Sequence, residues 1–170
     1  MYKISRLQIY IIILIAISMQ IGPLNYLKIF GMKPDVVLIS VVFFGLLLGP
    51  GAGLEAGIAA GLLKDIFTLD FFWINTFIMA LAGLCVGMAS DKFFKESKKA
   101  VFTVVLFTTI LSMSAHYFLV YIFSKNFALN YFSYFLSSVM PACIYTGLVS
   151  IPLYIAFVNI YNLKEADDYI

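Results

Sequence analysis

The sequence predicts an all-α integral membrane protein in which residues 1–170 form one compact bundle of about six transmembrane helices. Two observations support this prediction. Of the 170 residues, 63% are hydrophobic and only 12% are charged, whereas soluble domains average about 25% charged residues. The mean hydropathy is +1.01. Because a spanning helix needs about 20 residues, the length allows roughly six spans and leaves no room for a soluble domain.

The first predicted span covers residues 7–24 and follows the basic residues Lys3 and Arg6. A basic start before an apolar run is also typical of a signal peptide. However, no small-x-small cleavage site follows, and the run is long enough to cross a bilayer. We therefore interpret it as a membrane helix, followed by a loop over residues 25–33.

Pro34 and Asp35 open the second predicted span, which ends at residue 48. Proline suits the first helical position because its missing N–H would be unpaired there. A carboxylate beside it favours the positive end of the helix dipole. We therefore favour a capping role for Asp35 over a functional contact.

Glycine recurs at every fourth position before and within the third predicted span, residues 51–67. These glycines are Gly45, Gly49, Gly53, Gly57 and Gly61. Residues four apart share one face of a helix, and small residues let membrane helices approach closely. We expect the face of the last three to contact another helix, within the fold or in a partner. Pro50 interrupts the run and predicts a very short turn there.

Three charged residues belong to this third span. Glu55 lies away from the glycine face, near the start of the helix, so a functional intramembrane acid and a wetted interfacial acid are equally good interpretations. Lys64 and Asp65 close the helix and point in different directions. Asp65 is either a solvated helix end or, with Asp35, part of an outer surface that positions a partner segment.

The fourth predicted span covers residues 72–90, with Asn75 near its start. Gly83 and Gly87 are again four residues apart, which predicts a second face for close packing. The segment that follows, residues 91–99, carries the densest charge in the chain. It is interpreted as a solvated loop or as a segment that lies on anionic lipid.

The fifth predicted span covers residues 101–123 and contains His116, the only histidine. No cysteine or acid stands within a turn of it. We therefore interpret His116 as a hydrogen-bonded packing residue and not as a metal ligand or proton carrier.

Aromatic residues and serines over residues 125–139 predict an amphipathic segment at the membrane interface. Pro141 is then expected to start the sixth span, residues 141–161, and Pro152 to bend it. With the N-terminus inside, cytoplasmic segments would hold seven of the 11 lysines and arginines. This bias favours both termini in the cytoplasm.

Motifs for catalysis are missing from the sequence: there is no nucleophile elbow, zinc-protease motif, carboxylate pair or phosphate-binding loop. Cys85 and Cys143 are isolated and are interpreted as small core residues. No basic polar surface suggests nucleic acid. We therefore expect no catalytic residue, metal or cofactor, and a protein that binds other membrane components and lipid.

A set of motifs along the chain resembles one known family. Lys33-Pro34-Asp35 is followed by an apolar run, Gly49-Pro50, the spaced glycines and then Gly61-Leu62-Leu63-Lys64-Asp65. Asn75-Thr76 follows, with Gly83 and Gly87 behind it. This combination resembles the MreD family of rod shape-determining proteins over almost the whole chain. One departure is Trp73, where the family commonly has a small residue or glycine.

The resemblance implies a non-enzymatic protein of the bacterial inner membrane that belongs to the cell-elongation machinery. Its partners would be the periplasmic coiled-coil protein MreC, the glycosyltransferase RodA with its penicillin-binding transpeptidase, and indirectly MreB filaments. Self-association into a homo-oligomer stays open. The residues expected at partner contacts or helix packing are Pro34, Asp35, Gly53, Glu55, Gly57, Gly61, Lys64, Asp65, Asn75, Gly83 and Gly87.

The MreD family is also similar in fold to the substrate-binding subunits of energy-coupling-factor vitamin transporters. The alternative function is therefore a membrane subunit that binds a small ligand from outside and transfers it to an ATPase module. That function needs an outer pocket lined with aromatic and polar groups. Asn75 and the aromatic residues 71–73 are the candidates for it.

Overall fold

The computed structural model describes residues 5–26, 28, 31–68, 73–90, 98–123 and 130–160. The secondary-structure elements of this part are all helices, which confirms the all-α prediction. They are α1 (Arg6–Ile21), η1 (Pro23–Asn25), α2 (Val36–Leu48), α3 (Pro50–Thr68), α4 (Ile74–Met88), α5 (Lys98–Phe123), α6 (Tyr131–Tyr134), η3 (Phe135–Val139) and α7 (Met140–Ile160). The charged segment 91–99 falls almost entirely outside the described residues.

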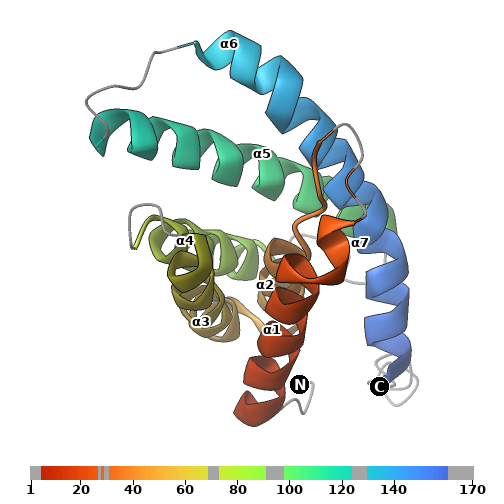
Figure 1. Cartoon of the computed structure of the whole chain (residues 1–170). Helices are drawn as coiled ribbons and strands as arrows, with labels where there is room; N and C mark the ends of the chain where they lie inside the picture. The colour runs from red at the N-terminus through yellow and green to blue at the C-terminus, as the bar shows by residue number, and fades with distance from the viewer. Residues whose placement is uncertain are drawn as a thin grey trace.

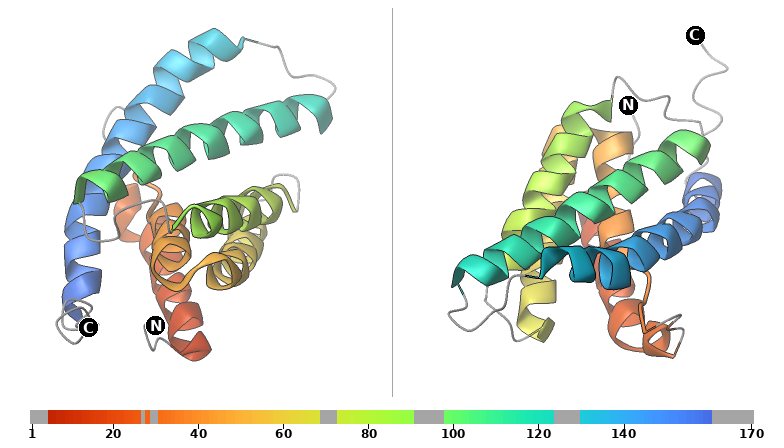
Figure 2. Two further views of the ribbon diagram at one scale, coloured as in Figure 1. Left: turned by 180° about the vertical axis from the view of Figure 1, so that it is seen from behind. Right: turned by 90° about the horizontal axis from the view of Figure 1, so that it is seen from above.

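Helices α1 to α4 form one bundle, and the longer α5 and α7 lie against it (Figure 1). Seen from behind, α5 and α7 cross and then diverge toward α6 (Figure 2). The start of α1 and the end of α7 lie at the same end of the molecule (Figure 1). Successive helices of the bundle alternate in direction. Consequently the end of α1, the start of α2, the end of α3 and the start of α4 meet at one end.

Local sequence signals set the ends of α1 and α2. Ser5 and Gln8 form a reciprocal capping box at the start of α1. The Asp35 carboxylate accepts a hydrogen bond of 3.0 Å from the Leu38 N–H, so its predicted capping role is confirmed. Pro34 is not the first helical residue as we expected. It precedes the cap, because Asp35 itself has non-helical backbone angles.

Helix α2 is the centre of the bundle. Eleven of its 13 residues are buried, and its side chains contribute to both hydrophobic clusters of the core. A helix that is apolar all round is stable when other helices surround it. Gly49, at a φ of 90°, ends α2 and turns the chain directly into Pro50 of α3, as the Gly-Pro pair predicts.

The predicted glycine face packs α3 against α4. A Cβ atom at Gly57 would lie closer than 3.0 Å to the backbone of Met79 and Ala80, and one at Gly53 would meet the backbone of Gly83 in the same way. Gly61 packs on the start of α4, and Gly87 packs on the turn at Pro50. The glycine faces therefore do not dock a partner helix, because backbone contacts within the fold already occupy them.

The chain from residue 131 onward differs from its prediction. Residues Tyr131–Ile160 form one continuous helical run of 30 residues, so residues 131–139 are not separated from the last helix as we expected. Residues 125–129 lie outside the described residues, and the interfacial position of the segment stays a prediction. Pro141 lies inside this run instead of starting a helix. The preceding residues, Phe135–Val139, adopt a wider π-helical turn. Such a turn accommodates the missing N–H and the bulk of a proline. Pro152 lies within α7, and the run is curved (Figure 1).

Two of the described helices are long and apolar enough to cross a bilayer, Lys99–Phe123 and Tyr131–Ile160. Three further apolar helices are shorter: Arg6–Ile21, Val36–Leu48 and Ile74–Met88. The 13 residues of α2 rise only about 20 Å, less than the ~30 Å of a typical hydrocarbon core. The count of six spans therefore stays a prediction.

Candidate functional site

An ion pair joins α3 to the start of α2 at the end of the bundle where four helix ends meet. Lys64 donates from Nζ to Asp35 Oδ2 over 2.6 Å, and each of the two side chains is 23% exposed. The Asp35 N–H donates to Thr146 Oγ1 of α7 over 3.2 Å. Burial raises the pKa of Asp35, but the charge and hydrogen bond of Lys64 and the Leu38 N–H outweigh it and hold the pKa below its usual range.

Gln20 ties the end of α1 to the same point. Its side-chain oxygen accepts a 3.0 Å hydrogen bond from the Val36 N–H, one of the unpaired donors at the start of α2. Its backbone carbonyl accepts another from Lys33 Nζ, also over 3.0 Å. Side chains or backbone from α1, α2, α3 and α7 thus converge on a few residues of chain around Asp35.

Asp65 caps α4 from across the helix interface. Its Oδ1 accepts hydrogen bonds from the backbone and side-chain nitrogens of Asn75, at 3.0 and 2.9 Å. Its Oδ2 accepts from the N–H groups of Trp73 and Thr76, each at 3.0 Å, and from Thr76 Oγ1 at 2.6 Å. Five donors at a helix N-terminus suit a carboxylate. Asp65 is 3% exposed, so neither a solvated helix end nor an exposed partner surface describes it.

Trp73 has an unusual backbone. It precedes α4 with a φ of 96°, in the left-handed region that favours glycine. Its N–H donates to Asp65, and its ring lies edge-on to Phe77 and Phe123 at centroid distances of 6.4 and 5.2 Å. A glycine at this position would adopt the same backbone conformation without strain.

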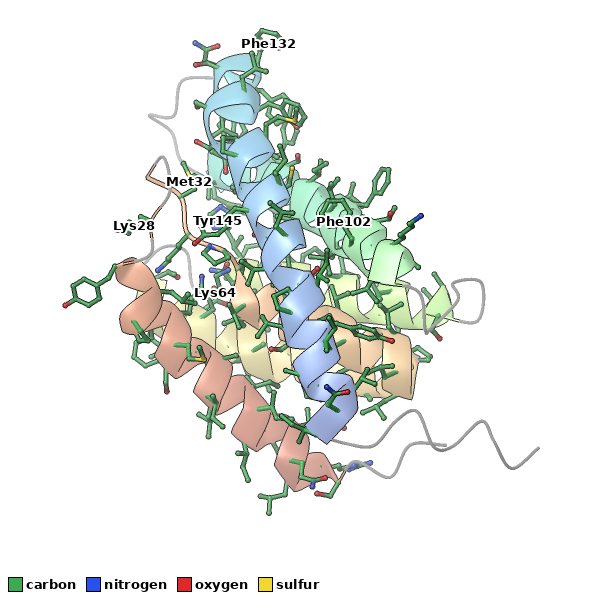
Figure 3. The ribbon with its side chains drawn as sticks, turned by 90° about the vertical axis from the view of Figure 1, so that its right-hand side faces the viewer. Lys28, Met32, Lys64, Phe102, Phe132 and Tyr145 are labelled. Carbon is green, nitrogen blue, oxygen red and sulfur yellow. The ribbon has the colours of Figure 1, made fainter. Side chains whose placement is uncertain are left out.

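A cavity of about 430 Å³ opens beside these contacts, and three predicted site residues line it: Asp35, Lys64 and Asn75. Figure 3 shows Lys28, Met32 and Lys64 gathered near the end of α1. His116 of α5 also lines the cavity, which places the lone histidine beside polar groups. The polar and charged members of the wall are Gln20, Lys28, Lys33, Asp35, Lys64, Thr68, Asn75, Thr109, Ser112, His116, Tyr134 and Thr146.

Glu55 belongs to a different place, near the start of α3. The Tyr10 hydroxyl of α1 donates to Glu55 Oε1, and Arg6 Nε lies 3.8 Å from Oε2. Glu55 therefore links α3 to α1 and does not face the cavity. The structure brings Asp35 together with Lys64, and Asp65 with Asn75, and it leaves Glu55 outside both groups.

Sequence reasoning missed several cavity residues, among them Gln20, Thr109 and Thr146. Each is one of several polar residues in a largely apolar helix, so the sequence carried no signal that singled it out. The two cysteines also differ from each other. Cys143 is buried as predicted, whereas Cys85 is exposed and is not a core residue. Within the described residues, no group of three or more histidines, cysteines or acids could hold a metal ion.

Comparison with known proteins assigns the chain to a family. No curated protein matches the sequence, and no solved structure matches the fold. The family described as rod shape-determining protein MreD matches residues 1–164 of the 170. This match covers every helix described above. The chain therefore belongs to the rod shape-determining protein MreD family, a family of membrane proteins.

Proposed function

We propose that this protein is a non-enzymatic, multi-pass component of the bacterial cell-elongation machinery in the inner membrane. In this proposal it binds MreC and helps to organise or regulate RodA and its penicillin-binding transpeptidase, and acts indirectly with MreB. The observation that carries the proposal is the MreD family match over residues 1–164, which supports a role in rod-shape determination.

The use of the charged side chains supports a binding role over a catalytic one. The three acids on or beside the described membrane helices all contact groups of a neighbouring helix: Asp35 with Lys64, Asp65 with the start of α4, and Glu55 with Tyr10. An intramembrane pump or enzyme needs ionisable groups that change partners during its cycle. Here these groups hold the helices together.

The proposed orientation puts both termini in the cytoplasm and the cavity end outside. The basic residues favour it, and the alternating helix directions are consistent with it, because α1 starts and α7 ends at the same end (Figure 1). A cysteine in place of the exposed Lys28, in a chain without Cys85 and Cys143, tests it. We expect labelling by a membrane-impermeant maleimide added to intact spheroplasts. Labelling only after the membrane is opened would reverse the orientation.

Affinity purification of the tagged protein in mild detergent, with mass spectrometry, tests the partners. We expect MreC, RodA and the transpeptidase to be recovered. Gly57→Leu, which forces a large side chain into the α3–α4 contact, should recover none of them. Gly51→Ala, at a helical glycine with open space around it, should recover all. If the Gly57→Leu and Gly51→Ala variants recovered equal amounts of MreC, RodA and the transpeptidase, recognition by these partners would not depend on the folded protein.

A second candidate function is favoured by the cavity itself. Its volume of about 430 Å³ falls within the range of small-molecule sites, and Asn75, His116 and Tyr134 supply polar and aromatic walls. These features suit a substrate-binding subunit of an energy-coupling-factor type transporter. Recovery of a transmembrane coupling protein with two ATPases in the same purification would establish this function and overturn the first.

A further inference from the structure

Two side-chain amides in the cavity wall form hydrogen bonds within the protein at only one of their ends. Gln20 Oε1 accepts from the Val36 N–H over 3.0 Å, and Asn75 Nδ2 donates to Asp65 Oδ1 over 2.9 Å. These bonds fix the orientation of each amide, because an N–H needs an acceptor and an ionised carboxylate only accepts. Within the described residues, the opposite atoms, Gln20 Nε2 and Asn75 Oδ1, have no hydrogen-bond partner.

Both of these atoms are accessible although their residues are buried. Gln20 is 8% exposed and Asn75 is 7% exposed, and both line the cavity. No buried side-chain nitrogen or oxygen of the described residues lacks a partner, so the small exposed part of each side chain includes its unpaired atom. Amides at this depth are normally hydrogen-bonded. The wall therefore offers an amide donor from Gln20 and an amide acceptor from Asn75.

A hydroxyl group of α5 adds to these two amides. Thr108 and Thr109 donate their hydroxyls to carbonyl oxygens one turn back in the helix. Ser112 lies one turn beyond Thr108 and lines the cavity, and its hydroxyl has no hydrogen-bond partner within the described residues. A hydroxyl both donates and accepts. Ser112 can therefore complement either kind of group on a ligand.

The charged side chains of the wall contrast with these neutral groups. Lys64 pairs with Asp35, and Lys33 donates to the Gln20 carbonyl and also interacts with Asp35. Lys28, the fourth charged residue that lines the cavity, is exposed. The deeply placed hydrogen-bonding capacity that remains open is therefore uncharged, and it includes both a donor and an acceptor.

We propose that this cavity binds an uncharged, hydroxyl-rich small molecule, such as a monosaccharide or a cyclic polyol, through Gln20, Asn75 and Ser112. Each hydroxyl of such a molecule both donates and accepts, so one ligand can pair with all three groups. A simple anion would leave the Asn75 oxygen unpaired, and a simple cation would leave the Gln20 nitrogen unpaired. The inference rests on the second candidate function and deepens it by naming a class of ligand.

The size of the cavity and the rest of its wall suit this ligand. The volume of about 430 Å³ is many times the ~30 Å³ that one water molecule takes up in the liquid. Leu38, Ile78, Met79 and Met113 also line the cavity, and their apolar side chains can cover the C–H faces of a sugar or polyol ring. Small-molecule sites commonly combine such apolar walls with a few polar groups.

Equilibrium dialysis tests the ligand class with the purified full chain, in a detergent without a sugar headgroup and with no partner protein present. The probes are glucose and inositol, gluconate as a charged relative of glucose, and cyclohexanol as a six-membered ring with a single hydroxyl. We expect saturable binding of glucose or inositol, with gluconate and cyclohexanol at least tenfold weaker. A cavity that holds water alone would bind neither glucose nor inositol, and that result would overturn the proposal. Equal binding of gluconate or cyclohexanol would also overturn it.

Three variants locate the site. Ser112→Ala removes one hydroxyl and should weaken binding several-fold without changing the melting temperature. Gln20→Glu keeps an acceptor for the Val36 N–H but replaces the donor nitrogen by oxygen, and it should weaken binding at least tenfold. Ser137→Ala, at an exposed serine outside the cavity wall, should bind like the native chain. Native affinity in folded Ser112→Ala and Gln20→Glu variants would contradict the site.

The outcome of these experiments is separate from the choice between the two proposed functions. The partners recovered by affinity purification decide that choice, whereas binding by the isolated chain decides the ligand class. Recovery of a coupling protein with two ATPases, together with no binding of glucose or inositol, would support the transporter function and overturn the inference made from the cavity wall.

Discussion

Lys64 and Asp35 lie 29 positions apart in the sequence, yet the Lys64 ammonium donates to the Asp35 carboxylate over 2.6 Å. The same carboxylate caps α2 through its other oxygen. Asp35 therefore caps the start of α2 and also holds α3 against it. The predicted capping role of Asp35 is confirmed, and the structure adds an ion pair with Lys64 that the sequence did not predict.

Removing the lysine should leave a partly buried carboxylate without its charged partner. We expect Lys64→Met to lower the free energy of unfolding by about 2 kcal/mol, the usual scale for a hydrogen bond to a charged group. Thermal unfolding in detergent measures it. Lys99→Met is the control, because Lys99 is exposed. Equal melting temperatures for the two variants would show that the ion pair does not stabilise the fold.

The same ion pair predicts a pH dependence. Despite the effect of burial, Lys64 and the Leu38 N–H hold the pKa of Asp35 below its usual range in the folded protein. A folded pKa below the unfolded one means that the stabilisation is fully present above about pH 4 and decreases as the pH falls through the folded value. The stability gap between the native chain and Asp35→Asn should therefore narrow below about pH 4. A gap that widens there would contradict the lowered pKa.

Two glycines of α3 separate packing from helix propensity. Alanine at Gly57 would place a Cβ against the Met79 backbone, whereas alanine at Gly51 meets open space. We expect Gly57→Ala to destabilise the protein by about 1–3 kcal/mol through overpacking. Gly51→Ala should be neutral or stabilising by up to about 1 kcal/mol. Melting curves of the two variants, recorded side by side, decide this prediction.

Asp65 accepts five hydrogen bonds, so its loss should cost more than the loss of any one donor. We expect Asp65→Ala to lower the free energy of unfolding by about 3 kcal/mol, since it strands buried N–H groups at the start of α4. Thr76→Val removes a single donor and should cost about 1 kcal/mol. Similar losses in denaturation experiments would argue against this capping role.

Position 73 allows backbone strain and ring packing to be separated. Trp73→Gly and Trp73→Ala both remove the ring contacts with Phe77 and Phe123, but only glycine adopts a φ of 96° without strain. We expect the glycine variant to be more stable than the alanine variant by about 1 kcal/mol. The difference in their melting temperatures measures it, and a more stable alanine variant would contradict the left-handed conformation.

Much of the helical architecture was predictable from local chemistry. Apolar runs marked the helices, Asp35 marked a cap, and the Gly-Pro pair at residues 49–50 marked a turn. The glycine spacing in α3 predicted a close helix contact. These features depend on residues within a few positions of one another, which is why the sequence reveals them.

Which surfaces meet depended on the tertiary structure. The sequence could not show that the glycine face of α3 packs on α4 instead of on a partner, because the spacing is the same in both cases. Nor could it show that Asp65 caps a different helix, or that Thr146 and Gln20 share a cavity wall with Lys64. Contacts between distant segments depend on how whole helices pack. The sequence by itself determined an all-helical chain, the Asp35 cap and the close-packing glycine faces, and the tertiary structure decided which segments those faces and the other polar groups contact.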